Sequence, residues 1–319
     1  MRILVVGAGA IGGYFGGRLL HAGRDVTFLV RPRRAAELGD SGLRIKSPQG
    51  DLVQRAPPTI LAENLGEFFD LVLLSCKAYD LQPAMNAFAA AVGPDTMILP
   101  LLNGMRHLDT LDMRFGGHHV LGGQCVIAAT LDEHRAVVHL NDVHTLSFGE
   151  RDGRISDRIR LVAKLFGSAG FEGRLSDHIV QEMWDKWVFL ATLASVTCLM
   201  RASIGDIVAS PGGSESILTL LEECRAIAEA EGHPPHTSIL EGARLALTAR
   251  DSPLTASMLR DLEGNARVEA DHVIGDLLQR RDSALANRNE RSLLAAAYTH
   301  LKAYETRRAR SVAAESHER

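Results

Sequence analysis

One stretch of the sequence, from Arg2 to Arg31, constrains the fold more than any other. A short apolar run at residues 3–6 leads directly into GAGAIG at residues 7–12, which has the pattern G-x-G-x-x-G. The run has the length of a buried strand. A turn, a helix that ends near Gly23 and a second apolar strand over residues 25–30 are expected to follow. In such a unit the glycines permit a tight turn, approach of the backbone to a pyrophosphate and close packing of helix on strand.

The sequence therefore predicts a dinucleotide-binding turn at the start of the chain. Helix N-termini favour anions, because their N–H groups and their dipole point at the ligand. A flexible glycine-rich loop is the alternative, and the succession of strand, turn, helix and strand argues against it. The residues predicted to bind the pyrophosphate are Gly7, Ala8, Gly9, Ala10, Ile11 and Gly12.

The residue that ends the second strand indicates which dinucleotide is bound. Proteins that bind NAD usually place Asp or Glu there, where the carboxylate binds the ribose 2′-hydroxyl. This chain has Arg31, followed by Arg33 and Arg34, and no acidic residue before Glu37. A guanidinium can bind a 2′-phosphate through two parallel hydrogen bonds, whereas a carboxylate would repel it. The sequence predicts NADP(H) as the cofactor, with Arg31 at the 2′-phosphate; a solvated basic turn is the alternative.

The remaining pattern indicates an α/β protein with two domains. Strands and helices alternate up to about residue 150, as in a domain built on a parallel sheet, and nearly all of the chain after residue 177 has helical character. We predict a Rossmann-type NADP-binding domain at residues 1–176 and an all-α substrate-binding and catalytic domain at residues 177–319. After Arg34 we expect a loose polar region, then four short strands between residues 120 and 148.

Composition and charge limit the partners. Of the 319 residues, 46% are hydrophobic, and the net charge of −4 without a long Lys/Arg patch argues against nucleic acid. The longest apolar run, residues 188–200, is too short to span a membrane. The four scattered cysteines are expected to be reduced thiols, and the chain begins with its first strand rather than a signal peptide. We expect a cytoplasmic protein and leave its oligomeric state open, with a homodimer as one alternative.

Polar side chains stand directly after two further predicted strands. Lys77 follows the apolar run at residues 70–75, and Asn103 follows the one at residues 96–102. Open parallel sheets bind ligands outside the carboxyl ends of their strands, so Lys77 is well placed, and Asn103 lies at the same level. On spacing alone, Lys77 is equally typical of a surface lysine at the start of a helix, and Asn103-Gly104 taken alone is interpreted as an ordinary turn.

Five histidines lie between residues 118 and 144 without the spacing of a metal site. Among them, His139 alternates with apolar neighbours and is expected to face solvent from a strand. We expect no bound metal.

Two ionisable residues of the helical domain are candidates for acid–base chemistry. Lys186 lies in a predicted helix over residues 179–200, in the sequence WDKWVFL, whose apolar bulk would disfavour a charged ammonium and suit a general acid. The alternative is a lysine on the exposed edge of a buried helix. Glu269 falls on the apolar stripe of a predicted helix over residues 258–279, where a carboxylate needs a partner such as Lys186 or a cofactor hydroxyl. An exposed pair with a basic neighbour one turn away is its alternative.

Taken together, these motifs resemble those of the ketopantoate reductases (2-dehydropantoate 2-reductases). The resemblance extends over nearly the whole chain. It rests on GAGAIG at residues 7–12, Arg31, CKAYD with Lys77, NGM with Asn103, WDKWV with Lys186, Gly205-Asp206, and SMLRDLEGNARVEAD with Ser257 and Glu269. For the cofactor it implies that the glycine turn and Arg31 bind NADPH, that Lys77 and Asn103 border the nicotinamide ribose, and that Ala129 lies near the nicotinamide.

The same resemblance implies roles in the chemistry. Lys186 would protonate a ketone oxygen as hydride reaches the neighbouring carbon. Ser257 would hydrogen-bond the substrate carboxylate, and Asn103 and Lys186 would also contact the substrate. Glu269 would orient Lys186 or the cofactor.

The substrate half of the resemblance is incomplete. Ketopantoate reductases usually carry asparagines one and two turns after the catalytic lysine, where this chain has Leu190 and Ala194. An apolar side chain cannot hydrogen-bond a substrate hydroxyl, so the discrimination that such a bond provides would be missing. The sequence predicts NADPH-dependent reduction of a small 2-oxo acid, with 2-dehydropantoate as the first candidate. The alternatives are another 2-oxo acid or ketone on the same scaffold, and a catalytically silent NADP-binding protein.

Overall fold

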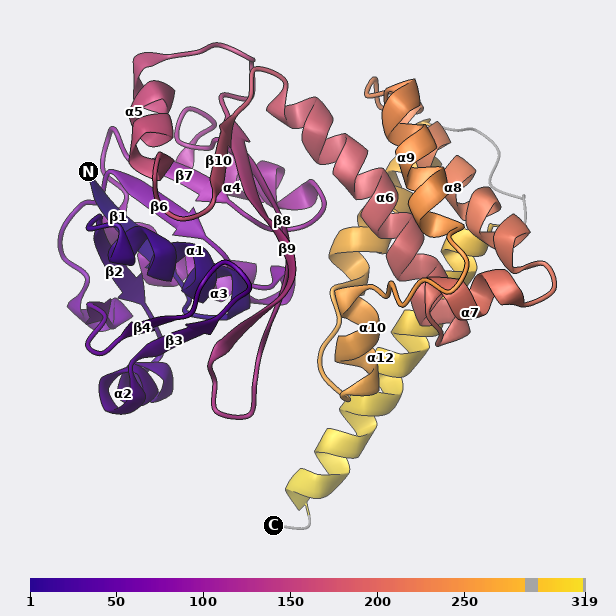
Figure 1. The fold of residues 1–319 in the computed structure, drawn as a ribbon, viewed down its shortest axis with the longest axis horizontal. Helices are drawn as coiled ribbons and strands as arrows, with labels where there is room; N and C mark the ends of the chain where they lie inside the picture. Colours follow the sequence, from indigo (N-terminus) through magenta and orange to yellow (C-terminus); the bar gives the residue numbers. More distant parts are fainter. Residues whose placement is uncertain (285–291, 318–319) are drawn as a thin grey trace. The chain divides into compact units, whose positions relative to one another are not determined.

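The computed structural model describes residues 1–284 and 292–317 and consists of two compact units, Met1–Val180 and Gln181–Arg319 (Figure 1). The division lies four residues beyond the predicted boundary at 176/177, inside helix α6 (Ile179–Met200).

The N-terminal unit is built on a five-stranded parallel sheet in the order β5-β2-β1-β6-β7. Its strands are β1 (Arg2–Val6), β2 (Asp25–Leu29), β5 (Thr59–Ile60), β6 (Leu71–Leu74) and β7 (Met97–Pro100). All residues of β6 and β7 and the last four of β1 are buried, which is why these strands are apolar throughout rather than alternating. This confirms the predicted α/β, Rossmann-type fold and places the turn after β1 at the centre of the sheet.

Helix α1 (Ala10–His21) contacts both the parallel sheet and a second sheet. The second sheet contains β3 (Leu43–Lys46), β4 (Leu52–Gln54), β8 (Gly122–Leu131), β9 (Val137–Gly149) and β10 (Glu172–Leu175), in the order β10-β9-β3-β4 with β8 paired to β9. Helix α1 contacts strands of both sheets, and its Tyr14 and Phe15 are fully buried. The helix that begins at the glycine turn is therefore held from two sides.

The prediction of four short strands between residues 120 and 148 was wrong. The region forms one antiparallel pair of long strands, β8 and β9, with a register shift between Ile127 and Ala129. At the shift, the side chain of Asn141 accepts a hydrogen bond from the backbone N–H of Ala128 at 2.9 Å. Such an irregularity breaks the alternation of side chains without ending the strand.

The loose polar region expected after Arg34 is also corrected, because it forms helix α2 (Pro32–Ser41). Leu38 is its one buried residue, so the helix has no apolar stripe for the sequence to display. Helix α4 (Arg106–Phe115) was not predicted either, and it too is largely polar.

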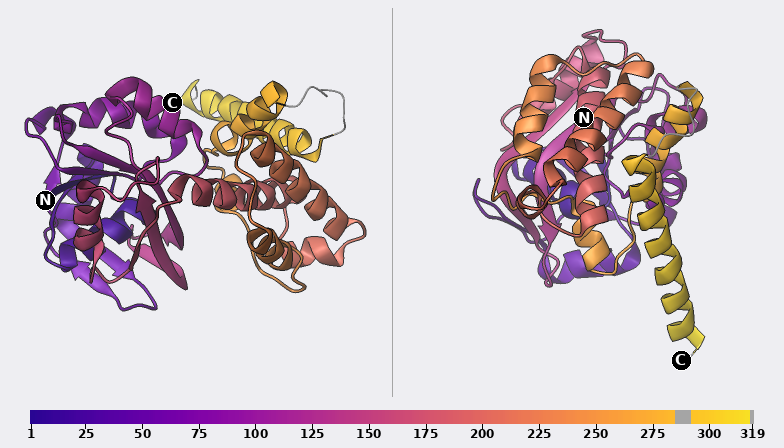
Figure 2. Two further views of the ribbon diagram at one scale, coloured as in Figure 1. Left: turned by 90° about the horizontal axis from the view of Figure 1, so that it is seen from above. Right: turned by 90° about the vertical axis from the view of Figure 1, so that its right-hand side faces the viewer.

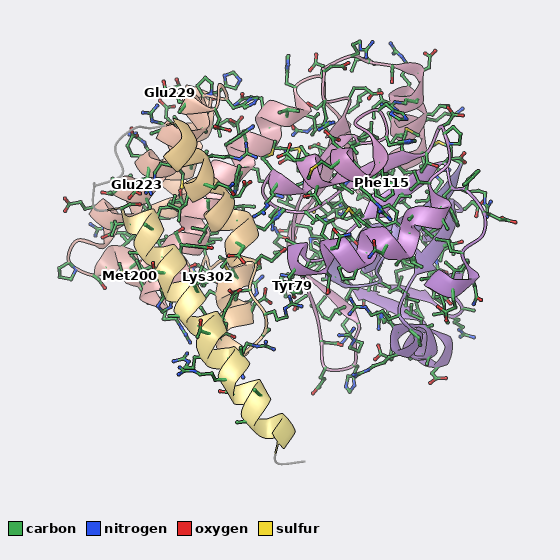
Figure 3. The ribbon with its side chains drawn as sticks, turned by 180° about the vertical axis from the view of Figure 1, so that it is seen from behind. Tyr79, Phe115, Met200, Glu223, Glu229 and Lys302 are labelled. Atoms are coloured by element: carbon green, nitrogen blue, oxygen red, sulfur yellow. The ribbon has the colours of Figure 1, made fainter. Side chains whose placement is uncertain are left out.

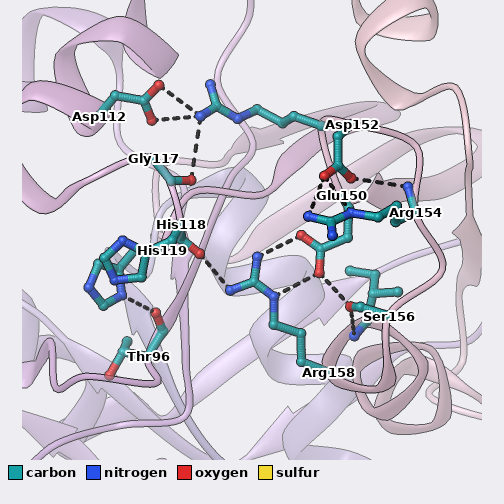
Figure 4. Close-up of polar contacts among 12 residues, drawn as sticks. Thr96, Asp112, Gly117, His118, His119, Glu150, Asp152, Arg154, Ser156 and Arg158 are labelled. Carbon is teal, nitrogen blue, oxygen red and sulfur yellow. Dashed lines mark hydrogen bonds and ion pairs between the residues drawn. The ribbon is translucent and has the colours of Figure 1, made fainter.

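Ion pairs tie the end of β9 to α4 and to helix α5 (Asp157–Phe166), as Figure 4 shows. Arg158 donates to Glu150 through Nε at 2.7 Å and Nη2 at 2.6 Å, and these bonds hold the pKa of Glu150 below its usual value. Arg151 donates to Asp112 at 2.7 and 2.8 Å. These ion pairs hold α4, α5 and the segment after β9 together.

The described part of the C-terminal unit is helical. Besides α6 it contains α7 (Ile204–Ala209), α8 (Gly213–Ala230), α9 (Thr237–Leu247), α10 (Ser257–Glu263), the π-helical segment η4 (Asp271–Gly275), α11 (Asp276–Ala284) and α12 (Leu293–His317). The end of α12 extends beyond the other helices of this unit (Figure 2), while Lys302, labelled in Figure 3, pairs with Asp271 of η4 at 3.0 Å. Among the residues described, no helix is both long and apolar enough to cross a membrane.

The continuous helix predicted over residues 258–279 was wrong. Helix α10 ends at Glu263, and Asn265 then adopts the left-handed conformation with φ of 53°. The hydroxyl of Tyr304 donates to the carbonyl of Ala266 at 2.7 Å, and Arg308 donates to that of Asn265 at 2.8 Å, so the break is stabilised by α12. Glu269 therefore precedes η4 instead of continuing a helical stripe from α10.

Candidate active site

Three predicted ligand-binding positions lie at the same edge of the parallel sheet. Gly7 directly follows β1, Lys77 comes three residues after β6, and Asn103 comes three residues after β7. The strand ends are in register, because Val6 pairs with Leu74 and Leu74 with Pro100. Lys77 and Asn103 are both half-buried. This is the carboxyl edge, where open parallel sheets bind their ligands.

The turn after β1 requires glycine at two positions. Gly7 has a φ of 93°, a conformation that side chains disfavour, and its N–H donates to the carbonyl of Leu29 at 2.9 Å. At Gly12, a Cβ atom would lie 2.2 Å from both the carbonyl oxygen of Gly7 and Oγ of Ser75. The helix can approach the strand this closely only because residue 12 has no side chain.

The N-terminus of α1 has the features of an anion site. Gly9 occupies the N-cap in an extended conformation, and within the described structure no side chain caps this end of the helix. The first turn contains no acidic residue, and a Cβ on Gly9 would meet nothing within 4 Å. The first N–H groups of a helix have no partner inside it and favour a negative charge. These features fit the pyrophosphate of a dinucleotide.

The three arginines after β2 are placed differently from one another. Arg31 precedes α2, its side chain is 75% exposed, and it donates to Asp80 at 3.2 Å. Such exposed pairs contribute about 0–1 kcal/mol, so this guanidinium can exchange its partner for a ligand. Arg33 points into solvent, whereas Arg34 is turned inward to the carbonyl of Ala8. Sequence reasoning did not distinguish Arg34 from its neighbours.

Ala129 lies on β8, in the second sheet, directly after the register shift and opposite His139. The expectation that His139 faces solvent was wrong: it is buried and bonds to Oγ of Ser47 at 2.9 Å. Residues two apart on a strand share a face, and His139 shares that of the buried Val137. The described residues contain no group of three or more His, Cys, Asp or Glu side chains that could hold a metal.

Helix α6 presents Lys186 among buried aromatic and aliphatic residues. Trp184, Trp187 and Val188 are buried, while Lys186 is half-buried. The preceding residue, Asp185, is also buried and accepts a hydrogen bond from Gln181 at 2.9 Å. Burial raises the pKa of the Asp185 carboxyl group. Lys186 thus stands among buried apolar residues in the sequence, with a buried carboxyl group directly before it.

Helix α6 also contacts the two segments that carry the other candidate residues of its unit. Nε1 of Trp187 donates to the carbonyl of Val273 at 2.8 Å, and the N–H of Val273 donates to the carbonyl of Glu269 at 3.0 Å. The hydroxyl of Thr197 accepts from the N–H of Ala256, which precedes Ser257, at 3.4 Å. Glu269 is half-buried and Ser257 exposed. The segments of both thus contact one helix, the one that carries Lys186.

Leu190 and Ala194 lie one and two turns after Lys186 and share its side of α6. Leu190 is half-buried and Ala194 is buried. Neither side chain can form a hydrogen bond, so this stripe between the Lys186 and Thr197 positions is apolar.

The parallel sheet and its glycine turn have the architecture of a dinucleotide-binding domain. Residues 3–153 match the family described as ketopantoate reductase PanE/ApbA, and residues 178–305 match the C-terminal domain of the same family. The chain belongs to the ketopantoate reductase family, whose members are oxidoreductases that act on CH–OH or C=O groups with a nicotinamide dinucleotide.

Individual relatives match over almost their entire lengths. An uncharacterized oxidoreductase of Bacillus subtilis, YkpB, is 36% identical over 306 residues, covering 96% of this chain and 99% of the relative. The 2-dehydropantoate 2-reductase of Halobacterium salinarum is 28% identical, covering 90% and 94%. The crystal structure of 2-dehydropantoate 2-reductase from Methylococcus capsulatus has a TM-score of 0.84 at 26% identity, covering 97% and 98%.

Proposed function

We propose that this protein reduces a small 2-oxo acid with NADPH, and that 2-dehydropantoate is its first candidate substrate. The observation that carries the proposal is the arrangement on α6, where one helix bears Lys186 and contacts the segments of Ser257 and Glu269. Binding of a dinucleotide alone would not require a half-buried lysine on the helix that also contacts the segments of Ser257 and Glu269. This argues against a catalytically silent binding protein.

In this proposal the N-terminal unit binds the cofactor. The N–H groups around the glycine turn bind the pyrophosphate, and Arg31 binds the 2′-phosphate in exchange for Asp80. Lys77 and Asn103, at the carboxyl edge of the sheet, border the nicotinamide ribose, and Ala129 lies near the nicotinamide. When bound, NADPH supplies the hydride.

In the proposed reaction, residues of the C-terminal unit supply the proton and, together with Asn103, bind the 2-oxo acid. The ammonium of Lys186 donates a proton to the ketone oxygen of the substrate, because that oxygen gains negative charge as the neighbouring carbon accepts hydride. Glu269 orients Lys186 or the cofactor, the hydroxyl of Ser257 donates to the substrate carboxylate, and Asn103 also contacts the substrate. A low local dielectric strengthens the interaction of an ammonium with developing charge, and Trp184, Trp187 and Val188 next to Lys186 in the sequence are buried.

A second candidate is the same reaction on a different 2-oxo acid or ketone, and one observation favours it. Leu190 and Ala194 cannot hydrogen-bond the hydroxyl group of 2-dehydropantoate. A site built to bond a substrate hydroxyl discriminates strongly against analogues that lack it, whereas an apolar site does not. Substrates whose side chain is purely aliphatic or aromatic are therefore the alternative to test.

The test is a screen of NADPH oxidation, followed by absorbance, over a panel of 2-oxo acids that includes 2-dehydropantoate and aliphatic and aromatic members. Turnover of 2-dehydropantoate above the rest supports the first candidate, and preference for an apolar acid supports the second. If NADPH binds tightly but none of the 2-oxo acids in the panel supports its oxidation, both candidates are contradicted.

A further inference from the structure

Arg34 of α2 connects the glycine turn to two other parts of the N-terminal unit. Its Nε donates to the carbonyl oxygen of Ala8 at 3.1 Å, its Nη1 to Oε2 of Glu37 at 3.1 Å and its Nη2 to the carbonyl oxygen of Arg135 at 3.3 Å. Arg135 lies in the turn between β8 and β9. One planar guanidinium thus joins the turn, α2 and the hairpin of the second sheet.

Burial separates Arg34 from the other arginines of this segment. Its side chain is 11% exposed, against 75% for Arg31 and 90% for Arg33. Burial lowers the pKa of Arg34, and the hydrogen bond with Glu37 opposes this effect. A guanidinium held in three directions and shielded from water is fixed in place, unlike the exposed Arg31.

Glu37 is the centre of the ionic contacts. Besides Arg34, it accepts from Nε of Arg33 at 3.0 Å and from Nε of Arg135 at 3.3 Å. The bond from Arg34 holds the pKa of Glu37 below its usual value, so the carboxylate is charged at neutral pH. The first acidic residue after β2 is therefore occupied by arginines and serves as their anchor.

We propose that Arg34 is a positioning residue that aims the backbone N–H groups of the glycine turn at the dinucleotide pyrophosphate. The carbonyl of Ala8 and the N–H of Gly9 belong to the same planar peptide and point in opposite directions. A hydrogen bond that fixes the carbonyl of Ala8 therefore also fixes the direction of the N–H of Gly9. This inference rests on the proposed binding of a dinucleotide and adds a residue that acts on both NADPH and NADH, since both carry the pyrophosphate.

The variant Arg34→Lys separates positioning from charge. Lysine keeps the positive charge but presents it as a point on a flexible stem, without the planar fork that reaches three acceptors. If Arg34 acts by long-range attraction, Arg34→Lys retains the affinity for both dinucleotides. If it positions the turn, the affinities for NADPH and NADH fall together, by about tenfold for the loss of one such hydrogen bond. Arg33→Lys is the matched control, because Arg33 contacts Glu37 but not the turn.

The experiment is a fluorescence titration of NADPH and NADH with the wild-type protein, Arg34→Lys, Arg33→Lys and Glu37→Gln, with circular dichroism of each to verify folding. We expect equal losses for both cofactors in Arg34→Lys, a smaller equal loss in Glu37→Gln and wild-type affinities in Arg33→Lys. If Arg34→Lys does not fold, the test rests on Glu37→Gln, which removes the carboxylate that anchors Arg34 but leaves the guanidinium. Equal losses of NADPH and NADH affinity in Glu37→Gln then support the inference, and wild-type affinities contradict it.

Two results would overturn the inference while leaving the proposed function standing: wild-type affinities in Arg34→Lys, or a loss confined to NADPH, which would make Arg34 a reader of the 2′-phosphate. Failure of the wild-type protein to bind either dinucleotide would overturn the proposed function and this inference together.

Discussion

The hydroxyl oxygen of Ser75 lies 2.2 Å from the position that a Cβ atom would take on Gly12. The same hydroxyl donates to the carbonyl of Val6 at 3.0 Å, so it is held at the end of β1 and has little freedom to withdraw. The carbonyl oxygen of Gly7 lies equally close to that Cβ position. Ser75 and Gly12 thus set the distance between β6 and α1 at the site of the turn.

Gly12→Ala should therefore destabilise the protein and impair dinucleotide binding together. A methyl group at this position forces the backbone of the turn to move, and overpacking of this kind costs about 1–3 kcal/mol. The measurements are thermal unfolding and NADPH titration. Gly9→Ala is the matched control. A Cβ on Gly9 has open space within the protein, so this variant should keep the wild-type melting temperature. Its methyl group would stand where the pyrophosphate approaches the backbone, so the affinity for NADPH should fall. A Gly12→Ala variant with unchanged melting temperature would contradict the close contact.

Arg31→Ala should weaken NADPH binding far more than NADH binding. A charge-assisted hydrogen bond contributes about 1.5–3 kcal/mol, which corresponds to roughly 10- to 150-fold in the dissociation constant, and only NADPH carries the 2′-phosphate. Asp80→Asn removes the present partner of Arg31 and should raise the affinity for NADPH. Titration of both cofactors with both variants measures this. Equal losses for the two cofactors in Arg31→Ala would disprove the assignment of NADP.

Lys186→Ala should lower turnover by about 10²- to 10⁴-fold, the usual contribution of a general acid, while NADPH binding is retained. Lys186→Arg is the informative companion, since arginine keeps the charge but does not release its proton near neutral pH. Both variants should therefore be slow. Steady-state kinetics with the best substrate of the 2-oxo acid panel gives the turnover. Near-normal turnover in either variant would remove Lys186 as the acid.

How far the sequence predicts this site depends on how local the interactions are. The turn at Gly7 and Gly12 and the helix over residues 179–200 were predicted because glycine spacing and apolar runs report local geometry and burial. The contact of Ser75 with Gly12 links residues 63 apart, and no periodicity encodes it.

The predicted helix over residues 258–279, with Glu269 on its apolar stripe, was wrong for a different reason. The spacing of Glu269 fitted a helical stripe, but Gly264 and Asn265 end α10, and carbonyl contacts from α12 stabilise the break. Those contacts come from residues 304 and 308, far along the chain.

Helix α2 likewise has no apolar stripe and is recognisable mainly from Pro32 at its start. Tertiary contacts thus decide the details that distinguish Arg34 from Arg31.

Leu190→Asn combined with Ala194→Asn should increase turnover of 2-dehydropantoate if the apolar stripe on α6 limits it. Each amide adds a donor and an acceptor for the substrate hydroxyl and carboxyl oxygens. Because Ala194 is buried, its substitution also carries a stability cost of about 1–3 kcal/mol, which thermal unfolding should show. The catalytic efficiency for 2-dehydropantoate, compared with that for an apolar 2-oxo acid, is the readout. An unchanged ratio of the two would indicate that other residues select the substrate.

The contact of His144 with Tyr14 predicts a dependence of stability on pH. Nδ1 of His144 lies 2.7 Å from the hydroxyl of Tyr14, and the groups that face the imidazole are His139, Arg18 and Glu172. Burial, followed by the nearby His139 and Arg18, lowers the pKa of His144, whereas Glu172 raises it. The folded protein therefore resists protonation of this imidazole more than the unfolded chain does.

Proton linkage gives the direction in which the free energy of unfolding changes with pH. Above the unfolded pKa of about 6.5, both states are neutral at this residue and it has no effect on pH dependence. As the pH falls below that value, the unfolded chain binds a proton first, so stability decreases until the folded pKa is reached. His144→Gln cannot titrate, and its amide can still bond the hydroxyl of Tyr14. The free energy of unfolding in urea should therefore fall more between pH 7.5 and 5.5 for the wild type than for His144→Gln. Parallel pH profiles for the two proteins would show that His144 does not contribute to the acid sensitivity of the N-terminal unit.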